Sequence, residues 1–219
     1  MDLERDRQCG ERRHWWLTLR ECRSDRGSTL PIYIWLTGIL LFVAFAFFAF
    51  AQAASARNGA QSAADAAALA ATQSARDELM GKLEQALDGE ADDWLDWLTG
   101  DGFDGTDAEA AASALAAAND ADVIGGPALT EVNGYPGYSV EIETRYTVGD
   151  TIIPGTENQK AKAHATAVIE PRCDIPPDAD PKKPVQLVCD GEDIEIDPDD
   201  FDPADLPDAS DLFSVHLAD

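Results

Sequence analysis

The chain has 219 residues, with 42 acidic residues against 16 Lys and Arg, and its formal net charge is −26. A chain this acidic is a poor candidate for nucleic-acid binding, because contacts to phosphate need Lys and Arg. Beyond the first 56 residues, about 160 residues remain, which is enough for one modest domain.

Residues 1–27 are predicted to form a cytoplasmic tail. They are polar and contain seven Arg and six acidic residues. The orientation of a membrane helix follows the number of Lys and Arg near its two ends. Five Arg lie shortly before the apolar segment that begins at Ser28, whereas only Arg57 follows it closely. The sequence therefore predicts a cytoplasmic N-terminus and an acidic C-terminal part outside the cytoplasm.

The uncharged residues 28–51 predict a single transmembrane helix. Twelve of the twenty residues from 32 to 51 are Ile, Leu, Val or Phe, and about twenty apolar residues cross the hydrocarbon core of a bilayer. Together they favour insertion by on the order of −6 kcal/mol. Ala51 and Ala53 also fit the cleavage pattern of a secretory signal, but the apolar core of a signal has about 7–15 residues. An anchor is therefore the favoured interpretation, and a cleaved signal is the alternative.

Residues 52–98 are predicted to continue as an extracytoplasmic stem helix rich in Ala, Leu, Gln and Glu. Ala56, Ala60, Ala64 and Ala68 recur at every fourth residue, a spacing that gives a helix one smooth face. One interpretation is that this face packs closely against a second helix, from an assembly protein or from another copy of the chain. The other is that an Ala-rich composition produces the row by chance.

A short motif joins the membrane segment to the stem. Asp25-Arg-Gly27 precedes the uncharged segment, and Arg57 is followed by Gln61-Ser-Ala-Ala-Asp65-Ala-Ala-Ala-Leu69-Ala. Over about residues 25–75 the chain resembles the N-terminal region of TadE/TadG-like proteins of the Flp (tight-adherence) pilus assembly system, in their actinobacterial form. The resemblance implies a pseudopilin-like membrane protein of a bacterial pilus apparatus. Together with the alanine row, the motif gives our candidate helix-packing residues, which are Arg57, Ala60, Gln61, Ala64, Asp65 and Leu69.

The resemblance has one departure. Prepilin-type processing sites of related proteins have Glu five residues after the Gly, whereas Gly27 is followed at that offset by Ile32. The sequence therefore does not predict processing after Gly27.

Trp94 and Trp97 lie three residues apart within an acidic stretch. On a helix, they and the neighbouring Leu95 and Leu98 form one broad apolar face. This face either packs on the core of its own domain or provides an aromatic anchor for a partner, because Trp is enriched at binding hot spots.

Residues 99–126 are predicted to form an acidic linker with one short helix. The pattern Thr106-Asp-Ala-Glu109 has the form of a capping box, in which the Thr side chain covers an open backbone N–H and the Glu reaches back. It predicts a helix that ends near Asn119. The Gly-Gly-Pro sequence at residues 125–127 is predicted to close the helical half of the chain.

Residues 127–219 are predicted to form a small antiparallel sheet domain. Apolar and polar residues alternate over 138–148 and over 160–169, which indicates two half-buried strands joined as a hairpin. Ala occupies the inner positions of the second strand, so the stem helix can lie close to it. Residues 197–211 are rich in Pro and Asp and are predicted to be extended and mobile. Shorter strands are expected at Val185–Cys189, Ile194–Ile196 and Leu212–Leu217.

The four cysteines divide between the two sides of the membrane segment. Cys9 and Cys22 precede it and are expected to be reduced thiols. Cys173 and Cys189 follow it, so an oxidising compartment predicts a disulfide between them. Two unpaired thiols are the alternative.

The sequence gives no pattern of catalytic, cofactor-binding or metal-binding residues. It contains no Gly-x-Ser-x-Gly, no Gly-rich phosphate loop and no His-Glu-x-x-His. The acidic runs at residues 101–107 and 190–200 have the oxygen ligands that Ca²⁺ prefers, but neither has the spacing of an EF-hand loop. The other interpretation of these runs is a solvated acidic surface. We therefore do not expect an enzyme.

These elements predict an α+β fold, with one N-terminal transmembrane helix, a long stem helix and a small antiparallel sheet domain. The residues alone indicate a membrane-anchored protein with an exported acidic domain. The resemblance implies a structural component of a Tad/Flp-type pilus assembly or export apparatus, with the bilayer and other assembly proteins as partners. The alternative function is an anchored extracytoplasmic binding or adhesion domain that uses Trp94 and Trp97.

Overall fold

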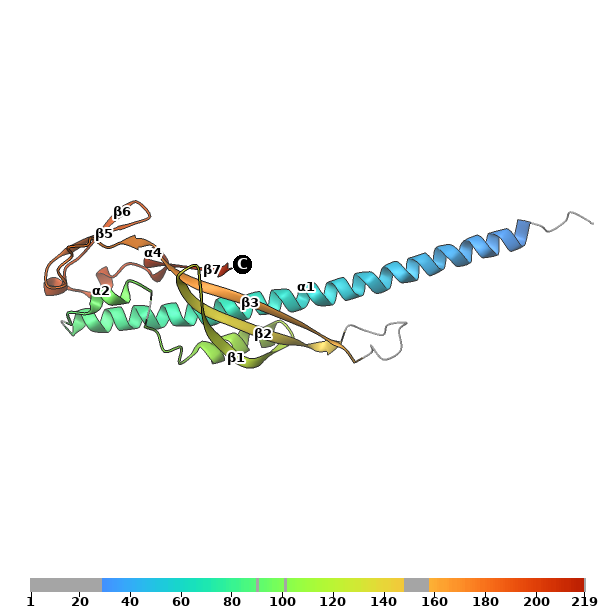
Figure 1. The fold of residues 1–219 in the computed structure, drawn as a ribbon, viewed down its shortest axis with the longest axis horizontal. Coiled ribbons are helices and arrows are strands. Elements are labelled where there is room, and N and C mark those ends of the chain that lie inside the picture. Colours follow the sequence, from blue (N-terminus) through green and yellow to red (C-terminus); the bar gives the residue numbers. More distant parts are fainter. Residues whose placement is uncertain (1–28, 90, 101, 148–157, 219) are drawn as a thin grey trace, which may run out of the picture. The chain divides into compact units, whose positions relative to one another are not determined.

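The computed structural model describes residues 29–89, 91–100, 102–147 and 158–218 (Figure 1). The chain divides into two compact units, residues 1–46 and residues 47–219. The first helix, α1 (Thr29–Asp88), contributes to both. In the first unit, the large apolar side chains of α1 from Leu30 to Phe45 are exposed. The predicted tail, with Cys9 and Cys22, lies outside the described residues.

In the described part of the second unit, the remainder of α1 is followed by the short α-helices α2 (Trp94–Trp97), α3 (Ala108–Ala118) and α4 (Ala209–Leu212). The stem helix was predicted to reach residue 98, and this is wrong: α1 ends at Asp88, because Gly89 follows it and glycine favours a helix end. The predicted capping box at α3 is also wrong. The N-cap residue of α3 is Asp107, and its side chain makes no capping hydrogen bond.

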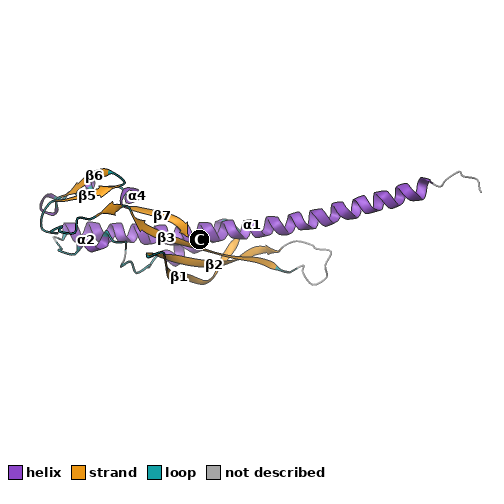
Figure 2. Cartoon of the chain, turned by 45° about the horizontal axis from the view of Figure 1, so that its top comes forward, coloured by secondary structure: helices purple, strands orange, loops and turns teal. Residues whose placement is uncertain are grey.

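Four antiparallel strands form the larger sheet, in the order β1-β2-β3-β7 (Figure 2). Their bounds are Ala121–Val132, Tyr135–Thr147, Lys160–Pro171 and Phe213–Ala218. The predicted alternation is confirmed. Val140 and Ile142 of β2 and Ala165 and Ala167 of β3 are buried, while Glu141 between the first two is exposed. Val148, at the end of the predicted first strand, lies outside the described residues.

Strand β1 begins at Ala121, before the predicted start of the sheet domain at residue 127. The sequence Gly125-Gly126-Pro127 does not end the segment but forms a bulge, at which the pairing with β2 shifts between Ile124 and Ala128. Both glycines have positive φ angles, of 73° and 81°, which glycine adopts without steric cost. Pro127 is tolerated because β1 is an edge strand.

A second sheet has the order β4-β5-β6, with bounds Cys173–Asp174, Val185–Cys189 and Glu192–Ile196. The predicted strands at 185–189 and 194–196 are confirmed, and so is the last strand, which pairs with β3. Asp190 and Gly191 form the two-residue turn between β5 and β6, with φ angles of 50° and 88°, as a type I′ turn requires. Residues 197–211 are not simply extended, because single 3-10 turns occur at Pro198–Asp200 and Pro203–Asp205.

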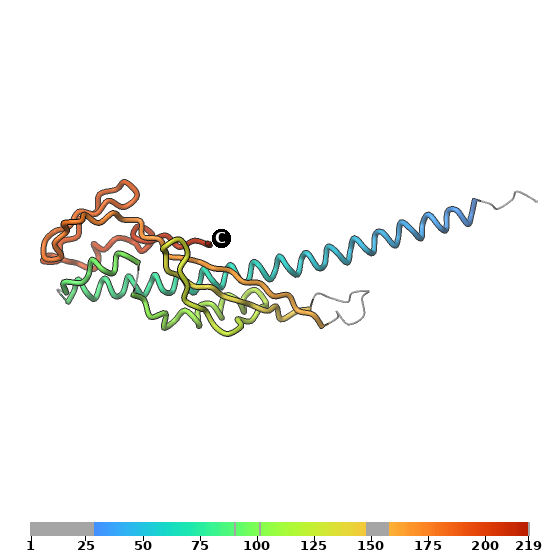
Figure 3. The backbone as a smooth tube through the Cα atoms, viewed as in Figure 1, coloured from blue at the N-terminus to red at the C-terminus, as the bar shows by residue number. Residues whose placement is uncertain are grey.

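The core of the second unit is built from small side chains. Residues 56–87 of α1 bury a stripe of Ala and Leu, α3 buries Ala108, Ala112 and Ala116, and both stripes join one apolar cluster with the inner face of the sheet. The backbone trace shows α1 beside β3 through this region (Figure 3). Small side chains permit this close approach of helix and strand. The predicted α+β fold is thereby confirmed.

Candidate functional site

The apolar beginning of α1 is the first candidate functional element. Among the described residues, α1 is the one helix long and apolar enough to cross a membrane, and its most apolar window has a mean hydropathy of 2.4 with no part buried. A helix rises 1.5 Å per residue, so twenty residues span about 30 Å, the thickness of the hydrocarbon core. This segment fits a membrane anchor.

The motif Gln61-x-x-x-Asp65 forms a brace between α1 and β3. The amide Nε2 of Gln61 donates a hydrogen bond to Oδ1 of Asp65, at 2.8 Å, and approaches the carbonyl oxygen of His164, at 3.3 Å. Leu69 is half-buried and packs on the core, whereas Arg57 is exposed. The polar residues of the motif thus link α1 to strand β3 of the same chain.

The alanine row of the stem faces the interior of its own domain. Ala60 and Ala64 have exposed fractions of 0%, as do their neighbours Ala63, Ala67 and Ala68. The prediction that Ala60 and Ala64 pack against a helix of another chain is therefore wrong, because their surface is already covered. The sheet, whose inner strand positions are also Ala, takes the place of the expected partner helix.

The two candidate anchor tryptophans have different environments. Trp94 is completely buried, and its indole Nε1 donates a hydrogen bond to the carbonyl oxygen of Pro181, at 2.9 Å. Trp97 is half-buried, and Nζ of Lys82 lies 5.1 Å from the centre of its ring, a cation–π arrangement. Of the two interpretations, packing on the core of its own domain is therefore confirmed for Trp94, and the partner anchor does not hold for it.

A polar cluster that the sequence analysis missed fastens the loop before α3 to α1. The carboxylate of Glu78 accepts hydrogen bonds from the backbone amides of Asp104, at 2.7 Å, and Gly105, at 2.9 Å. Nζ of Lys82 lies 2.9 Å from the same carboxylate and donates to the carbonyl oxygen of Gly102, at 2.8 Å. The spacing of Glu78 and Lys82, four residues apart on a helix, was the available signal.

The electrostatics of this cluster favour the charged forms of both side chains. Burial raises the pKa of Glu78, but the hydrogen bonds from Asp104, Lys82 and Gly105 outweigh it, so the pKa lies below its ordinary value. The hydrogen bond to Glu78 raises the pKa of Lys82, which burial opposes. The cluster is therefore a charged clamp for the loop.

Tyr138 of β2 packs against the same loop from the side of the sheet. Its ring lies 5.7 Å from that of Phe103, centre to centre, and a Cβ atom at Gly105 would collide with its hydroxyl. Gly105 has a φ angle of 68°, so both its backbone and its surroundings require glycine. Burial raises the pKa of Tyr138, and the carboxylates of Glu78 and Asp104 raise it further.

The predicted disulfide between Cys173 and Cys189 is confirmed. The two residues are direct cross-strand partners in β4 and β5, and their Cα atoms are 4.0 Å apart. Val185, Leu187 and Ile196 of the same sheet are buried. The disulfide therefore joins the short strand β4 to the β5–β6 hairpin, which buries these three apolar side chains.

The acidic runs do not gather into a cation site within the described part of the chain. No group of three or more His, Cys, Asp or Glu side chains there is arranged to hold a metal ion. Two of the aspartates act locally instead: the side chain of Asp197 accepts from the amide of Asp199, and that of Asp202 from the amide of Ala204.

Residues 27–77 match the Tad family model, described as putative Flp pilus-assembly TadE/G-like. The match confirms the resemblance, and it covers the apolar beginning of α1 together with the Gln61–Asp65 brace. No curated protein and no solved structure matches the chain.

Proposed function

We propose that this chain, which carries a TadE/G-like Tad domain at residues 27–77, is a membrane-anchored structural component of a Tad/Flp-type pilus assembly or export apparatus. In this role it is a single-pass, pseudopilin-like protein. Its partners are the lipid bilayer and other proteins of the assembly, with self-association as the alternative to a different partner. It has no catalytic role.

The observation that carries the proposal is the coincidence of the family match with an exposed apolar helix. The matched residues contain the complete uncharged segment, whose large side chains are exposed among the residues that the structure describes. In water such a surface is unfavourable by about 25 cal/mol for each Å². Insertion into a bilayer removes this cost. The family match to pilus-assembly proteins supports the same interpretation of the segment as a membrane anchor.

The proposed orientation places the N-terminal tail in the cytoplasm and residues 52–219 outside. Residues 1–27 contain seven Arg, and the excess of Lys and Arg near a membrane helix stays on the cytoplasmic side. The Cys173–Cys189 disulfide supports the same orientation, because disulfides persist in oxidising compartments outside the cytoplasm.

The alternative of a binding or adhesion domain loses its main support. It rested on Trp94 and Trp97 as an exposed aromatic anchor, and Trp94 is buried. The alanine row is buried as well, so contacts with assembly proteins have to use other surfaces. The helix face around Gly38 is one such surface, because no neighbouring atom of the described residues lies within 4 Å of a Cβ built there, and a small residue lets a second membrane helix approach closely.

Co-purification of the tagged full chain from membranes, after crosslinking, tests the proposed role. We expect membrane proteins of a pilus or export apparatus to be recovered with the chain. Gly38→Ile should reduce their recovery while the chain stays in the membrane, and Ala44→Ile, about a third of a turn away around the helix axis, should not. Recovery of no assembly protein, with pili unchanged when the chain is deleted, would contradict the proposal.

Topology is tested separately. A reporter fused after Asp219 should be active outside the cytoplasm, and Cys9 should resist membrane-impermeant thiol reagents in intact cells. Labelling of Cys9 from outside would reverse the orientation. A soluble mature form that begins at Ala54 would identify the apolar segment as a cleaved signal.

A further inference from the structure

Residues 128–132, at the end of strand β1, form an open edge of the larger sheet, here called the β1 edge. Among the residues that the structure describes, no strand pairs with the outer side of β1 (Figure 2), and Leu129 has an exposed fraction of 62%. Native proteins usually protect a sheet edge with a bulge, a proline or charged side chains. The bulge and Pro127 protect the preceding part of β1, whereas the β1 edge carries a single charge, on Glu131.

The hydrogen bonds of the β1–β2 hairpin determine which backbone groups of the β1 edge point outward. A two-residue turn follows β1, so Val132 and Tyr135 on either side of it bond to each other through both their N–H and C=O groups. Bonded and non-bonded pairs then alternate along an antiparallel ladder. Glu131, whose partner Pro136 has no N–H, and Leu129 belong to the non-bonded pairs. Their N–H and C=O groups therefore point away from β2.

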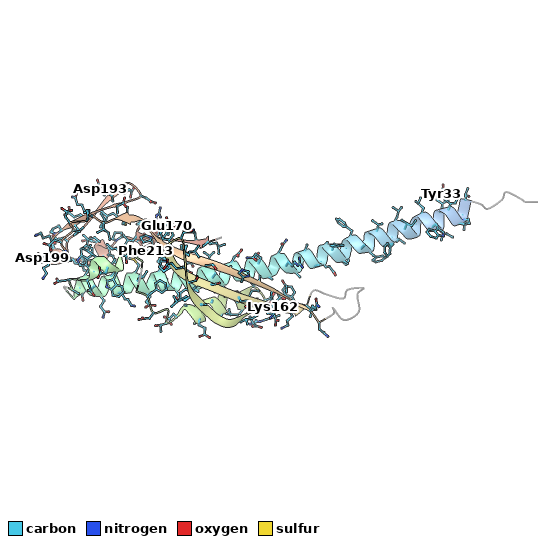
Figure 4. All side chains as sticks on the ribbon, in the orientation of Figure 1. Tyr33, Lys162, Glu170, Asp193, Asp199 and Phe213 are labelled. Atoms are coloured by element: carbon cyan, nitrogen blue, oxygen red, sulfur yellow. A yellow bond between two sulfur atoms is a disulfide. The ribbon has the colours of Figure 1, made fainter. Side chains whose placement is uncertain are left out.

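The hairpin carries little charge for a domain of this composition. Residues 123–140 contain one charged side chain, that of Glu131, whereas residues 52–219 contain 36 acidic and nine basic residues. Acidic side chains gather elsewhere, for example in residues 190–211, where Figure 4 labels Asp193 and Asp199. Two copies of so acidic a chain repel each other. The β1 edge is a surface at which a second copy can approach without bringing two rows of carboxylates together.

The β1 edge is complementary to itself. When residues 128–132 of two copies pair antiparallel, Thr130 faces Thr130, and each Leu129 faces Glu131 of the other copy. The outward N–H and C=O groups of these residues then make four hydrogen bonds across the two-fold axis. A pairing centred on Leu129 would place Glu131 opposite Pro127, which has no N–H. A pairing centred on Glu131 would set the two carboxylates opposite each other, so the centre at Thr130 is favoured.

We propose that the β1 edge of this chain pairs with the β1 edge of a second copy, antiparallel and centred on Thr130, so that the two larger sheets become one. The contact involves five residues of each copy, and contacts of this small size are weak and reversible. The inference concerns the sheet domain alone. It does not depend on the assembly role proposed above, whose partners are other proteins.

Cysteine crosslinking of the full chain in detergent tests both the contact and its register. The two cysteines of residues 1–27 are replaced by Ser, the native disulfide stays intact, and one new cysteine is introduced in each variant. In the proposed pairing the Cα atoms of the two Thr130 residues are about 4.5 Å apart, within the range of a disulfide. The two Leu129 residues, and likewise the two Glu131 residues, are diagonal neighbours about 7–8 Å apart, which is too far.

Under a mild oxidant, Thr130→Cys should therefore give a disulfide-linked dimer, and Leu129→Cys and Glu131→Cys should give little. Ser113→Cys, at an exposed position of α3, is the control for random encounters of two chains within one micelle. Added salt should increase the Thr130→Cys dimer, because it screens the repulsion between two chains of net charge −26.

A proline at position 131 separates the edge contact from the hairpin itself. Glu131→Pro removes an outward N–H but no bond to β2, since an edge strand tolerates proline where its N–H faces away from the sheet. In the Thr130→Cys chain it should reduce the dimer to the level of Ser113→Cys. Glu131→Val, which keeps the N–H, should not. The melting temperatures of the two variants show whether the fold is retained, and the register of crosslinking is a separate measurement on chains without the proline.

Three results would overturn the inference. One is a Thr130→Cys dimer no more abundant than that of Ser113→Cys, and another is equal crosslinking at positions 129, 130 and 131, which indicates contact without a register. The third is crosslinking of Thr130→Cys in membranes to a different protein and not to itself, which would assign the β1 edge to another partner. Each of these results leaves the membrane anchor of the proposed function in place.

Discussion

The hydroxyl of Thr72 donates a hydrogen bond to the carbonyl oxygen of Ala167, at 3.2 Å, and both residues are completely buried. This bond joins the middle of α1 directly to β3. The apolar cluster around this bond contains many alanines from both elements, which offer little shape to set their register. The hydroxyl, together with the contact from Gln61 to the carbonyl oxygen of His164, therefore helps to set the register of helix and strand.

Thr72→Val keeps the volume of the side chain but removes the hydroxyl donor. We expect the free energy of unfolding to fall by about 1 kcal/mol, the usual net value of such a hydrogen bond. Urea unfolding of the full chain in detergent, followed by the change in its tryptophan fluorescence, to which the buried Trp94 contributes, measures it. Thr147→Val, at an exposed strand position, should change stability by less than about 0.5 kcal/mol. A more stable Thr72→Val chain would show that packing outweighs the bond.

The Glu78 clamp predicts a pH dependence. The pKa of Glu78 is lower in the folded chain than its ordinary value of 4.5. Its contribution to stability is therefore fully present above pH 4.5 and is lost as the pH falls through the lowered, folded-state pKa. Glu78→Gln should lower the free energy of unfolding at neutral pH by about 1–2 kcal/mol. It should also flatten the loss of stability in the acidic range.

The control for this prediction is Glu84→Gln, which removes the same charge from an exposed position of the same helix. Thermal unfolding at neutral pH and at several values below pH 4.5 compares the two. If the stability of both variants depends on pH in the same way in the acidic range, the amides of Asp104 and Gly105 do not stabilise the Glu78 carboxylate specifically.

Local patterns in the sequence were sufficient for much of the fold. The alternation through Val140 and Ile142 identified the buried face of β2, because a half-buried strand exposes every second residue. The two cysteines that follow the apolar segment were enough to predict the disulfide. The uncharged segment identified the apolar part of α1, since its length and composition are themselves the physical requirement for a membrane span.

The sequence did not predict the contacts between segments that are far apart along the chain. The row through Ala60 and Ala64 indicates that something packs closely, but periodicity does not say whether the packing surface belongs to the same chain. Strand β1 was missed because Gly125-Gly126-Pro127 resembles a chain break. The Asn133-Gly134 pair, which forms the β1–β2 turn with φ angles of 55° and 87°, was the hairpin signal that could have found it.

Gly105→Ala should be unusually destabilising, because its new methyl group meets the hydroxyl of Tyr138 and its φ angle is positive. We expect a loss of about 1–3 kcal/mol. Gly125→Ala has a similar φ angle but open space around the new Cβ, so it should report the backbone cost alone. In a Tyr138→Phe background, the cost of Gly105→Ala should fall towards that of Gly125→Ala. An unchanged cost in that background would locate the strain entirely in the backbone.

The disulfide should stabilise the sheet domain measurably. Cys173 and Cys189 are separated by 16 positions, and a loop of this length corresponds to about 3 kcal/mol in the chain-entropy account. The double variant C173A/C189A should unfold at correspondingly lower urea, and reductant should shift the parent chain but not the variant. Non-reducing peptide mapping checks the pairing itself. Two separately alkylated thiols in the native chain would refute it.

The buried alanine row leads to a prediction opposite to the one its sequence suggests. If the row met a partner helix, Ala64→Leu would weaken assembly and leave the domain stable. Because Ala64 is completely buried within its own domain, the added side chain has to displace the sheet or the helix. Overpacking of this kind costs about 1–3 kcal/mol, so we expect a clear loss of stability in the isolated, detergent-solubilised chain.

Ala54→Leu is the matched control, since it places the same side chain at an exposed position of the same helix. It should leave the unfolding midpoint nearly unchanged, because Leu is almost as good a helix former as Ala. Urea unfolding of the two variants, without any partner protein present, separates the interpretations. A stable Ala64→Leu chain that nevertheless loses its assembly partners would restore the partner helix as the surface that covers the row. A destabilised one assigns the row to the interior of this domain, as the burial of Ala60 and Ala64 requires.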